Sequence, residues 1–141
     1  MEQMDIINAV SRMQKYIVEN LDDVTLDDLS AAAGYSKYHA VRLFKEAVGK
    51  APGEYIRALR LTKAAEGLRD AGGKIIDAAL KSGFVSHDGF TRAFMRQFDI
   101  TPQRYSREKP PVRYFVHYPI ESYYNMKGKV GKTKSVHYIL S

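Results

Sequence analysis

The sequence predicts an all-α fold of about seven helices in which one small unit occurs twice. Apolar residues recur at helical spacing in separate stretches, and these stretches are bounded by capping residues, glycine or proline. Residues 34–55 and 83–105 also repeat the same order of turn, helix and breaker. A chain of 141 residues is long enough for one domain or for two small helical subdomains.

Composition excludes several classes of protein. The chain has no cysteine, which removes disulfides, thiol catalysis and thiolate zinc fingers. No run approaches the roughly 18 apolar residues that span a bilayer, and the acidic N-terminus is not a secretory signal, so we expect a cytoplasmic protein and no membrane partner. The net charge is +6, with −5 on residues 1–30 and +11 on the remainder. A basic body suits a bound polyanion, although such an excess also simply aids solubility.

The first three helices are expected at residues 6–20, 26–33 and 37–48. Their inner faces are Ile6, Val10, Met13 and Ile17, then Leu26, Leu29 and Ala33, then Ala40, Leu43, Phe44, Ala47 and Val48. Thr25 and Asp28 have the spacing of a capping box before the second helix, and Ser36 caps the third. Gly34 supplies the left-handed residue at the turn between them, and Gly49 ends the third helix.

The fourth helix is expected at residues 52–70, with Pro52 at its first position, and at 1.5 Å per residue it is about 28 Å long. The remaining helices are expected at residues 75–82, 87–98 and from Thr101 to about Arg107. The inner faces are Tyr55, Ile56, Leu59 and Leu68, then Ile76, Ala79 and Leu80, then Phe90, Ala93, Phe94 and Phe98. Ser86 caps the sixth helix, and Gly83 corresponds to Gly34.

The two units align without gaps at an offset of 50 from Ser36 and Ser86 onward. Equivalent pairs include Arg42 and Arg92, Phe44 and Phe94, Pro52 and Pro102, and Tyr55 and Tyr105. Along the inner apolar stripe of the third helix, only Ala47 has a polar counterpart, Gln97, and Val85 is one extra residue in the second turn. Two copies of a turn followed by an amphipathic helix predict a duplicated helix-turn-helix unit.

The stretches GYSKYHAVRLFKEAVGKAPGEYIRALRLTKA and AALKSGFVSHDGFTRAFMRQFDITPQRY closely resemble the DNA-binding domain of the AraC/XylS family of bacterial transcription regulators. The resemblance covers about residues 5–108. It implies a double helix-turn-helix domain over residues 1–108, with a first unit at 5–51, a linker helix at 52–70 and a second unit at 74–108. Asp99 stands where many members have glycine, and aspartate tolerates the left-handed conformation expected there. Residues 109–141 are a tail or the start of a missing effector domain.

The resemblance implies that the protein is a sequence-specific transcription regulator. Each unit would insert its second helix into the major groove of double-stranded DNA, with the linker helix placing the two about one DNA turn apart, roughly 34 Å. Two different units would read an asymmetric site as a monomer and would bend DNA whose spacing does not match. RNA polymerase is a second expected partner, a small-molecule effector would act through an absent or incomplete C-terminal domain, and no cofactor is expected.

Seven residues on the outer faces of the two second helices are expected to contact bases. They are Tyr38, Val41, Arg42, His87, Asp88, Thr91 and Arg92. The fork of Arg42 or Arg92 fits guanine O6 and N7, Val41 suits a thymine methyl, and Asp88 can accept from a cytosine amine. Each also reads as an ordinary surface residue, and each arginine as a phosphate contact.

Eight further residues are expected to contact the DNA backbone. They are Ser36, Lys37, His39, Lys45, Arg57, Arg60, Ser86 and Arg104. The two serines are first of all N-caps, and the helix N-termini that they cap can also bind phosphate. The cationic residues would clamp phosphates, or would be solvated charge.

The tail differs in character from the helical body. Alternation of apolar and polar residues over 112–118 predicts a strand, and the tail would either pack on the helical body or begin a ligand-sensing domain. GKVGKT at 128–133 resembles a phosphate loop but lacks the first glycine, because Met126 occupies that position. The four histidines are too far apart in sequence to suggest a metal site.

Two other classes of function stay open. A helix-turn-helix module that binds protein would have acidic or apolar outer faces, against which Arg42, Lys45 and Arg92 argue. An enzyme with this fold, such as a DNA-repair protein, is the other class, but the sequence shows no Cys nucleophile and no paired carboxylate–histidine set.

Overall fold

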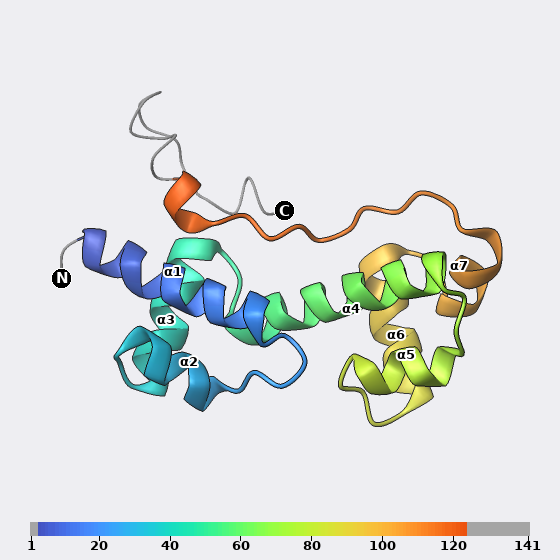
Figure 1. The fold of residues 1–141 in the computed structure, drawn as a ribbon, viewed down its shortest axis with the longest axis horizontal. Helices are drawn as coiled ribbons and strands as arrows, with labels where there is room; N and C mark the ends of the chain where they lie inside the picture. Colours follow the sequence, from blue (N-terminus) through green and yellow to red (C-terminus); the bar gives the residue numbers. More distant parts are fainter. Residues whose placement is uncertain (1–2, 124–141) are drawn as a thin grey trace. The chain divides into compact units, whose positions relative to one another are not determined.

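The computed structural model describes residues 3–123 as an all-helical chain (Figure 1). Seven helices follow one another as α1 (Gln3–Glu19), α2 (Leu26–Ala33), α3 (Lys37–Val48), α4 (Pro52–Asp70), α5 (Ile75–Lys81), α6 (His87–Phe98) and α7 (Pro102–Glu108). A last helical turn occupies residues 120–123. Among the described residues, no helix is long and apolar enough to cross a membrane.

Local capping chemistry explains most of these boundaries. Thr25 and Asp28 form the complete capping box at the start of α2, with bonds of 3.1 and 3.0 Å between side chain and backbone in each direction. Gly34 ends α2 in the left-handed region at φ 79°, where a side chain would be strained. Asp99 takes the left-handed position after α6 at φ 60°, as Gly49 does after α3 at φ 90°, so the conformation expected of Asp99 is confirmed.

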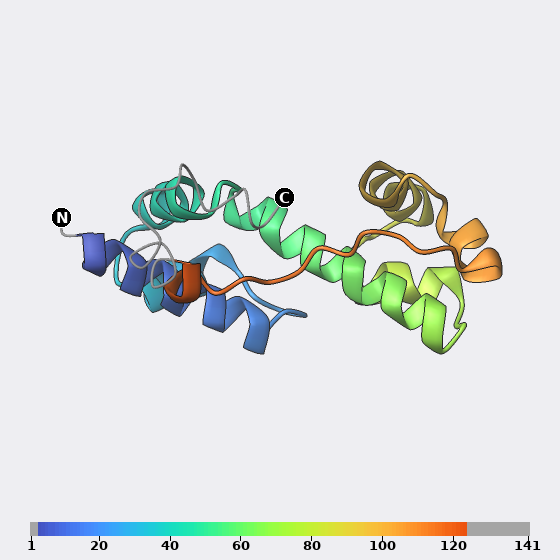
Figure 2. The same ribbon diagram turned by 90° about the horizontal axis from the view of Figure 1, so that it is seen from above.

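The chain divides into two compact units. The first comprises residues 3–56 together with 116–123, and the second is Arg57–Phe115. In the first unit, α1 contacts both α2 and α3, and α2 contacts α3, so that three helices enclose one core (Figures 1 and 2). The fully buried side chains include Met13, Ile17, Leu29, Phe44 and Tyr55, with the ring of Phe44 edge-on to that of Tyr55.

The core of the first unit contains the buried side-chain amide of Gln14, which forms hydrogen bonds with residues of the tail. Gln14 of α1 is 2% exposed, and its Oε1 accepts from the backbone N–H of Ile120 at 2.8 Å. Its Nε2 donates to the carbonyl of Tyr118 at 3.2 Å and to the hydroxyl of Tyr55 at 3.4 Å. The same hydroxyl lies 2.5 Å from Nδ1 of His117. Because buried polar groups need partners, Gln14 and these tail residues depend on one another.

The half-buried His117 gives this core a pH dependence. Burial lowers the pKa of His117 from its ordinary value of 6.5, so the folded protein holds the neutral ring. The unfolded chain then binds a proton that the folded chain does not. We therefore expect the free energy of unfolding to be highest above about pH 6.5 and to decrease as the pH falls through the lower pKa of the folded state. Urea unfolding of the wild type and of His117→Gln, followed over this range, would test the expectation. The part of the decrease that depends on His117 should disappear in this variant.

The second unit is built from α4 beyond Ile56, with α5, α6 and α7. Its core combines aliphatic residues of α4 and an aromatic row on α6 with one residue each from α5, the α6–α7 turn and α7. These residues are Leu61, Ala65, Leu68, Phe90, Phe94, Phe98, Ala79, Ile100 and Tyr105. Ring centroids of Phe94 lie 4.7 Å from Phe98 and 5.9 Å from Tyr105. Val112 and Tyr114 of the tail pack against this cluster.

Gln97 shows why one position of the repeat is polar. Its Nε2 donates to the carbonyl of Ala58 at 3.0 Å and reaches Oγ1 of Thr62 at 3.4 Å. Thr62 is itself buried in α4. The equivalent Ala47 is a buried apolar residue, so the two copies place different kinds of side chain at the same packing position.

Several sequence expectations are wrong in detail. The tail forms no strand over residues 112–118, because its alternate side chains pack singly on helices and among residues 3–123 no strand is present to pair with it. Ile7 rather than Ile6 is fully buried in α1, and Leu26 is 45% exposed. Leu59 is only partly buried. In α5, only Ala79 is buried, whereas Ile76 and Leu80 are exposed.

Candidate nucleic-acid interface

Three groups of hydrogen bonds fix the turn before α3. The N–H groups of Gly34 and Tyr35 both donate to the carbonyl of Ser30, at 2.9 and 3.3 Å, and the Ser30 hydroxyl donates to the Tyr35 carbonyl. Arg12 of α1 donates from Nε to the carbonyl of Ala32 at 2.8 Å and from Nη2 to that of Ala33 at 3.0 Å. The Arg12 guanidinium provides hydrogen-bond donors for carbonyl groups at the C-terminal end of α2. The turn is therefore fixed, and α3 begins in a defined direction.

α3 presents a largely polar outer face. Ser36 accepts from the N–H of His39 at 3.2 Å and so caps the helix. Opposite the buried stripe, the ring of Tyr38 is 77% exposed, and Arg42 and Lys45 are also exposed. Val41 is partly buried beside them, and His39 packs its ring 5.0 Å from that of Tyr35. All the expected α3 contacts therefore lie on this helix outside the core.

Acidic neighbours hold two cations of this face. Lys37 lies 2.9 Å from Asp27 of α2, and Nε of Arg42 lies 3.2 Å from Oε1 of Glu46 one turn later. The Arg42 side chain is 63% exposed. Exposed pairs of this kind contribute little energy, so a phosphate or a guanine can replace the carboxylate at small cost.

The second unit presents α6 in the same way. Ser86 caps it by accepting from the N–H of Gly89 at 3.1 Å, after a turn that contains the left-handed Gly83. Asp88 and Arg92 are exposed on its outer face. His87 is partly buried, and its Nε2 lies 3.1 Å from Nε2 of Gln103 in α7, which holds the ring in place.

Thr91 differs from the other expected contacts. Its hydroxyl oxygen is buried and, in the part of the chain that the structure describes, has no hydrogen-bond partner. A rotation about χ1 would be needed before that oxygen could face a ligand.

The remaining expected backbone contacts lie on α4 and α7. Arg57 is exposed on α4, and Arg60 is partly buried there. Arg104 of α7 donates from Nε to Glu108 at 3.0 Å. This hydrogen bond holds the pKa of Glu108 below its ordinary value. Arg104 therefore has an acidic partner, as Arg42 has in the first unit.

Two residues of these surfaces were not anticipated as functional. Val85 is 99% exposed in the turn before α6, although it is a large apolar residue. Its signal was present, because it is the extra residue in the second turn. The role of Arg12 gave no local signal, since its carbonyl partners lie about twenty residues away.

No metal site emerges among residues 3–123, where no three histidine, aspartate or glutamate side chains come together. GKVGKT, Met126 and His137 lie outside the described residues.

Two units with a Ser-capped exposed helix after a tight turn define the class of double helix-turn-helix proteins. A sequence profile described as a helix-turn-helix domain matches residues 29–108. The chain is 41% identical over 119 residues to the transcriptional regulator Rob of Salmonella typhimurium, covering 78% of this chain and 41% of Rob. The chain thus spans about two fifths of Rob.

Two further comparisons with known proteins indicate the same class of protein. The Tn10 TetD protein of Escherichia coli is 46% identical over 95 residues, which cover 67% of this chain and 69% of TetD. The crystal structure of a probable AraC family transcriptional regulator from Rhodopseudomonas palustris matches with a TM-score of 0.67 and 27% identity, over 74% of this chain and 99% of that chain. The chain belongs to the AraC/XylS family of DNA-binding transcription regulators.

Proposed function

We propose that this chain regulates transcription by inserting α3 and α6 into successive major-groove segments of an asymmetric DNA site. The observation that carries the proposal is the pair of capped helices with arginine at the equivalent exposed positions 42 and 92. Arginine is the commonest reader of guanine in the major groove, and each such contact discriminates by about 1–3 kcal/mol.

Within this proposal, the first unit is the stronger reader. Tyr38, Val41 and Arg42 meet base edges, and Lys37, His39 and Lys45 meet phosphates. In the second unit, reading depends mainly on Arg92, with Asp88 accepting from a cytosine amine and His87 beside it. Thr91 would contribute its methyl group. The exposed Val85 extends the second surface toward a sugar or a thymine methyl.

The backbone contacts would hold both units on the duplex. Ser36 and Ser86 place the N-terminal N–H groups of their helices where phosphates can bind. Arg57, Arg60 and Arg104 supply positive charge outside the two reading helices. The expected second partner is RNA polymerase, and a small-molecule effector would require sequence beyond the double helix-turn-helix domain.

Selection of bound DNA from a random pool tests the proposal. The recovered site should contain two dissimilar half-sites about one helical turn apart, roughly 10 base pairs between centres. Recovery of no consensus, or of a palindrome, would contradict the asymmetric two-helix mode.

The salt dependence of binding separates this function from a protein-binding module. Five cationic backbone contacts (Lys37, Lys45, Arg57, Arg60 and Arg104) give a slope of about −4 to −5 for log affinity against log salt. Affinity should therefore fall by about 10²–10³ between roughly 50 and 200 mM salt, as measured by fluorescence anisotropy. A flat response would favour the protein-binding alternative.

A further inference from the structure

Two sets of hydrogen bonds hold residues 112–120 of the tail, one set in each unit. We call each set a seat. In the second unit, the hydroxyl of Tyr105 lies 2.5 Å from that of Tyr114, and Oγ1 of Thr62 accepts from the N–H of Phe115 at 2.9 Å. In the first unit, the hydroxyl of Tyr55 lies 2.5 Å from Nδ1 of His117, and Oε1 of Gln14 accepts from the N–H of Ile120 at 2.8 Å.

These seats use equivalent parts of the duplicated unit. Tyr55 and Tyr105 occupy the same position of the repeat, 50 residues apart, and both are fully buried. In each seat, one such tyrosine bonds a tail side chain, while a buried side-chain oxygen of a long helix accepts a tail N–H. A tail lying loosely on a helical surface would not make the same pair of bonds twice.

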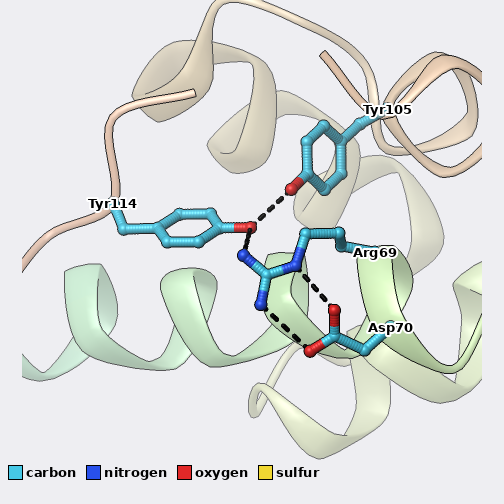
Figure 3. A network of polar contacts seen from close by, with 4 residues as sticks. All are labelled: Arg69, Asp70, Tyr105 and Tyr114. Carbon is cyan, nitrogen blue, oxygen red and sulfur yellow. Dashed lines mark hydrogen bonds and ion pairs between the residues drawn. The ribbon is translucent and has the colours of Figure 1, made fainter. Parts of the chain in front are cut away.

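An arginine strengthens the seat in the second unit (Figure 3). Nη1 of Arg69 donates to the hydroxyl of Tyr114 at 3.1 Å, and its guanidinium carbon lies 5.4 Å from the centre of the Tyr114 ring. Asp70 accepts from Nε and Nη2 of Arg69 at 2.6 and 3.0 Å and fixes the guanidinium. Burial and the bond to Tyr114 raise the pKa of Tyr105 to about 12, so its hydroxyl stays protonated at neutral pH.

The seat in the first unit is secured by burial. Ile120 is fully buried, and Tyr123 is 3% exposed. Because the aliphatic side chain of Ile120 is removed from water, this end of the tail is part of the folded core.

The chain passes between the units twice. The first passage is within α4, at Ile56 and Arg57, and the second is between Phe115 and Val116. Only Phe115 and Val116 separate the anchored residues Tyr114 and His117 in sequence, so a very short segment of chain sets the upper limit on the distance between these two anchors.

We infer that residues 112–120 form a strap, seated on the equivalent tyrosine of each unit, that limits the motion of one unit relative to the other. This inference rests on the proposed two-unit reading of DNA for its functional consequence. So short a connection keeps the second unit at a high effective concentration near the DNA once the first unit is bound to it. It would thereby raise affinity for the complete site without contacting DNA.

Inserting about six glycine and serine residues between Phe115 and Val116 tests the strap directly. Val116 is 68% exposed, so the insertion keeps both seats and only adds slack. We expect binding to the complete selected site to weaken about three- to tenfold, with binding to either half-site unchanged. The same insertion between Gly72 and Gly73, in an exposed loop of the second unit, is the matched control and should leave affinity unchanged.

A measurement without DNA keeps the test independent of the proposed function. Backbone ¹⁵N relaxation should report shorter and less similar rotational correlation times for the two units in the inserted variant than in the wild type. Tyr114→Phe, which removes only the bonded hydroxyl, should shift them in the same direction by less. Unchanged relaxation in both variants would overturn the strap. A wild type that selects no DNA sequence would overturn the proposed function alone, and the relaxation result would still decide on the strap.

Discussion

Replacing Phe94 by alanine is expected to lower the free energy of unfolding of the second unit by about 3–5 kcal/mol. The side chain is fully buried, and its ring contacts those of Phe90, Phe98 and Tyr105 with centroids 4.7 to 5.9 Å apart. The loss combines the transfer free energy of the ring with the cavity that remains. It should be measured by urea unfolding followed by circular dichroism.

The duplication supplies the comparison for this variant. Phe44→Ala changes the equivalent buried ring of the first unit, which contacts Tyr55 at 5.1 Å, and should cost a similar amount there. Met95→Ala changes the neighbouring residue of α6, which is 43% exposed, and should cost under about 1 kcal/mol. A cost for Phe94→Ala no larger than that for Met95→Ala would refute the aromatic core.

Replacing Arg42 by alanine is expected to weaken binding to the selected site by about 1–3 kcal/mol, or roughly 5- to 150-fold, and to relax preference at one base pair. Arg42 is exposed and outside the core, so the variant should unfold like the wild type. The planar fork of arginine makes two hydrogen bonds to guanine that lysine cannot reproduce, so Arg42→Lys should recover affinity in part but not the base preference. Competition binding against single-base variants of the site would measure both quantities.

Replacing Glu46 is expected to change DNA affinity in the opposite direction from replacing Arg42. The Glu46 carboxylate pairs with Arg42 and would lie near phosphates in the proposed complex. Glu46→Gln should therefore strengthen binding by a few-fold while leaving the base preference in place. Equal affinity and equal specificity of Arg42→Ala and the wild type would remove Arg42 from the reading surface.

The sequence predicted the helices well where boundaries depend on local chemistry. The bounds of α2, α3, α4 and α6 agree with expectation residue by residue, because caps such as Thr25 and Ser86, the left-handed Gly34 and the initiating Pro52 act within one turn. The all-α fold and the duplicated unit are likewise confirmed.

Features that depend on distant partners could not be read from the pattern. Gln14 bonds Ile120 across 106 positions, and no periodicity in α1 marks it as a tail anchor. Alternation in the tail sequence resembled a strand, but Val112 and Tyr114 pack on helices while Val116 is 68% exposed, so burial does not follow the alternation. Leu80 matches the helical spacing of a core face, yet Ala79 is the buried residue of α5 and Leu80 is 60% exposed. The individual DNA contacts stay predictions.

The shared frame of α3 and α6 also makes this protein modular for design. Both helices have 12 residues, begin after a serine cap and keep one buried phenylalanine, Phe44 or Phe94, at the same position. Surface residues of one helix can thus be transplanted onto the other position by position without disturbing either interior. Under the proposed two-helix mode, a chimera with the residue types of Tyr38, Val41, Arg42 and Lys45 on both helices is expected to bind a direct repeat in place of two dissimilar half-sites.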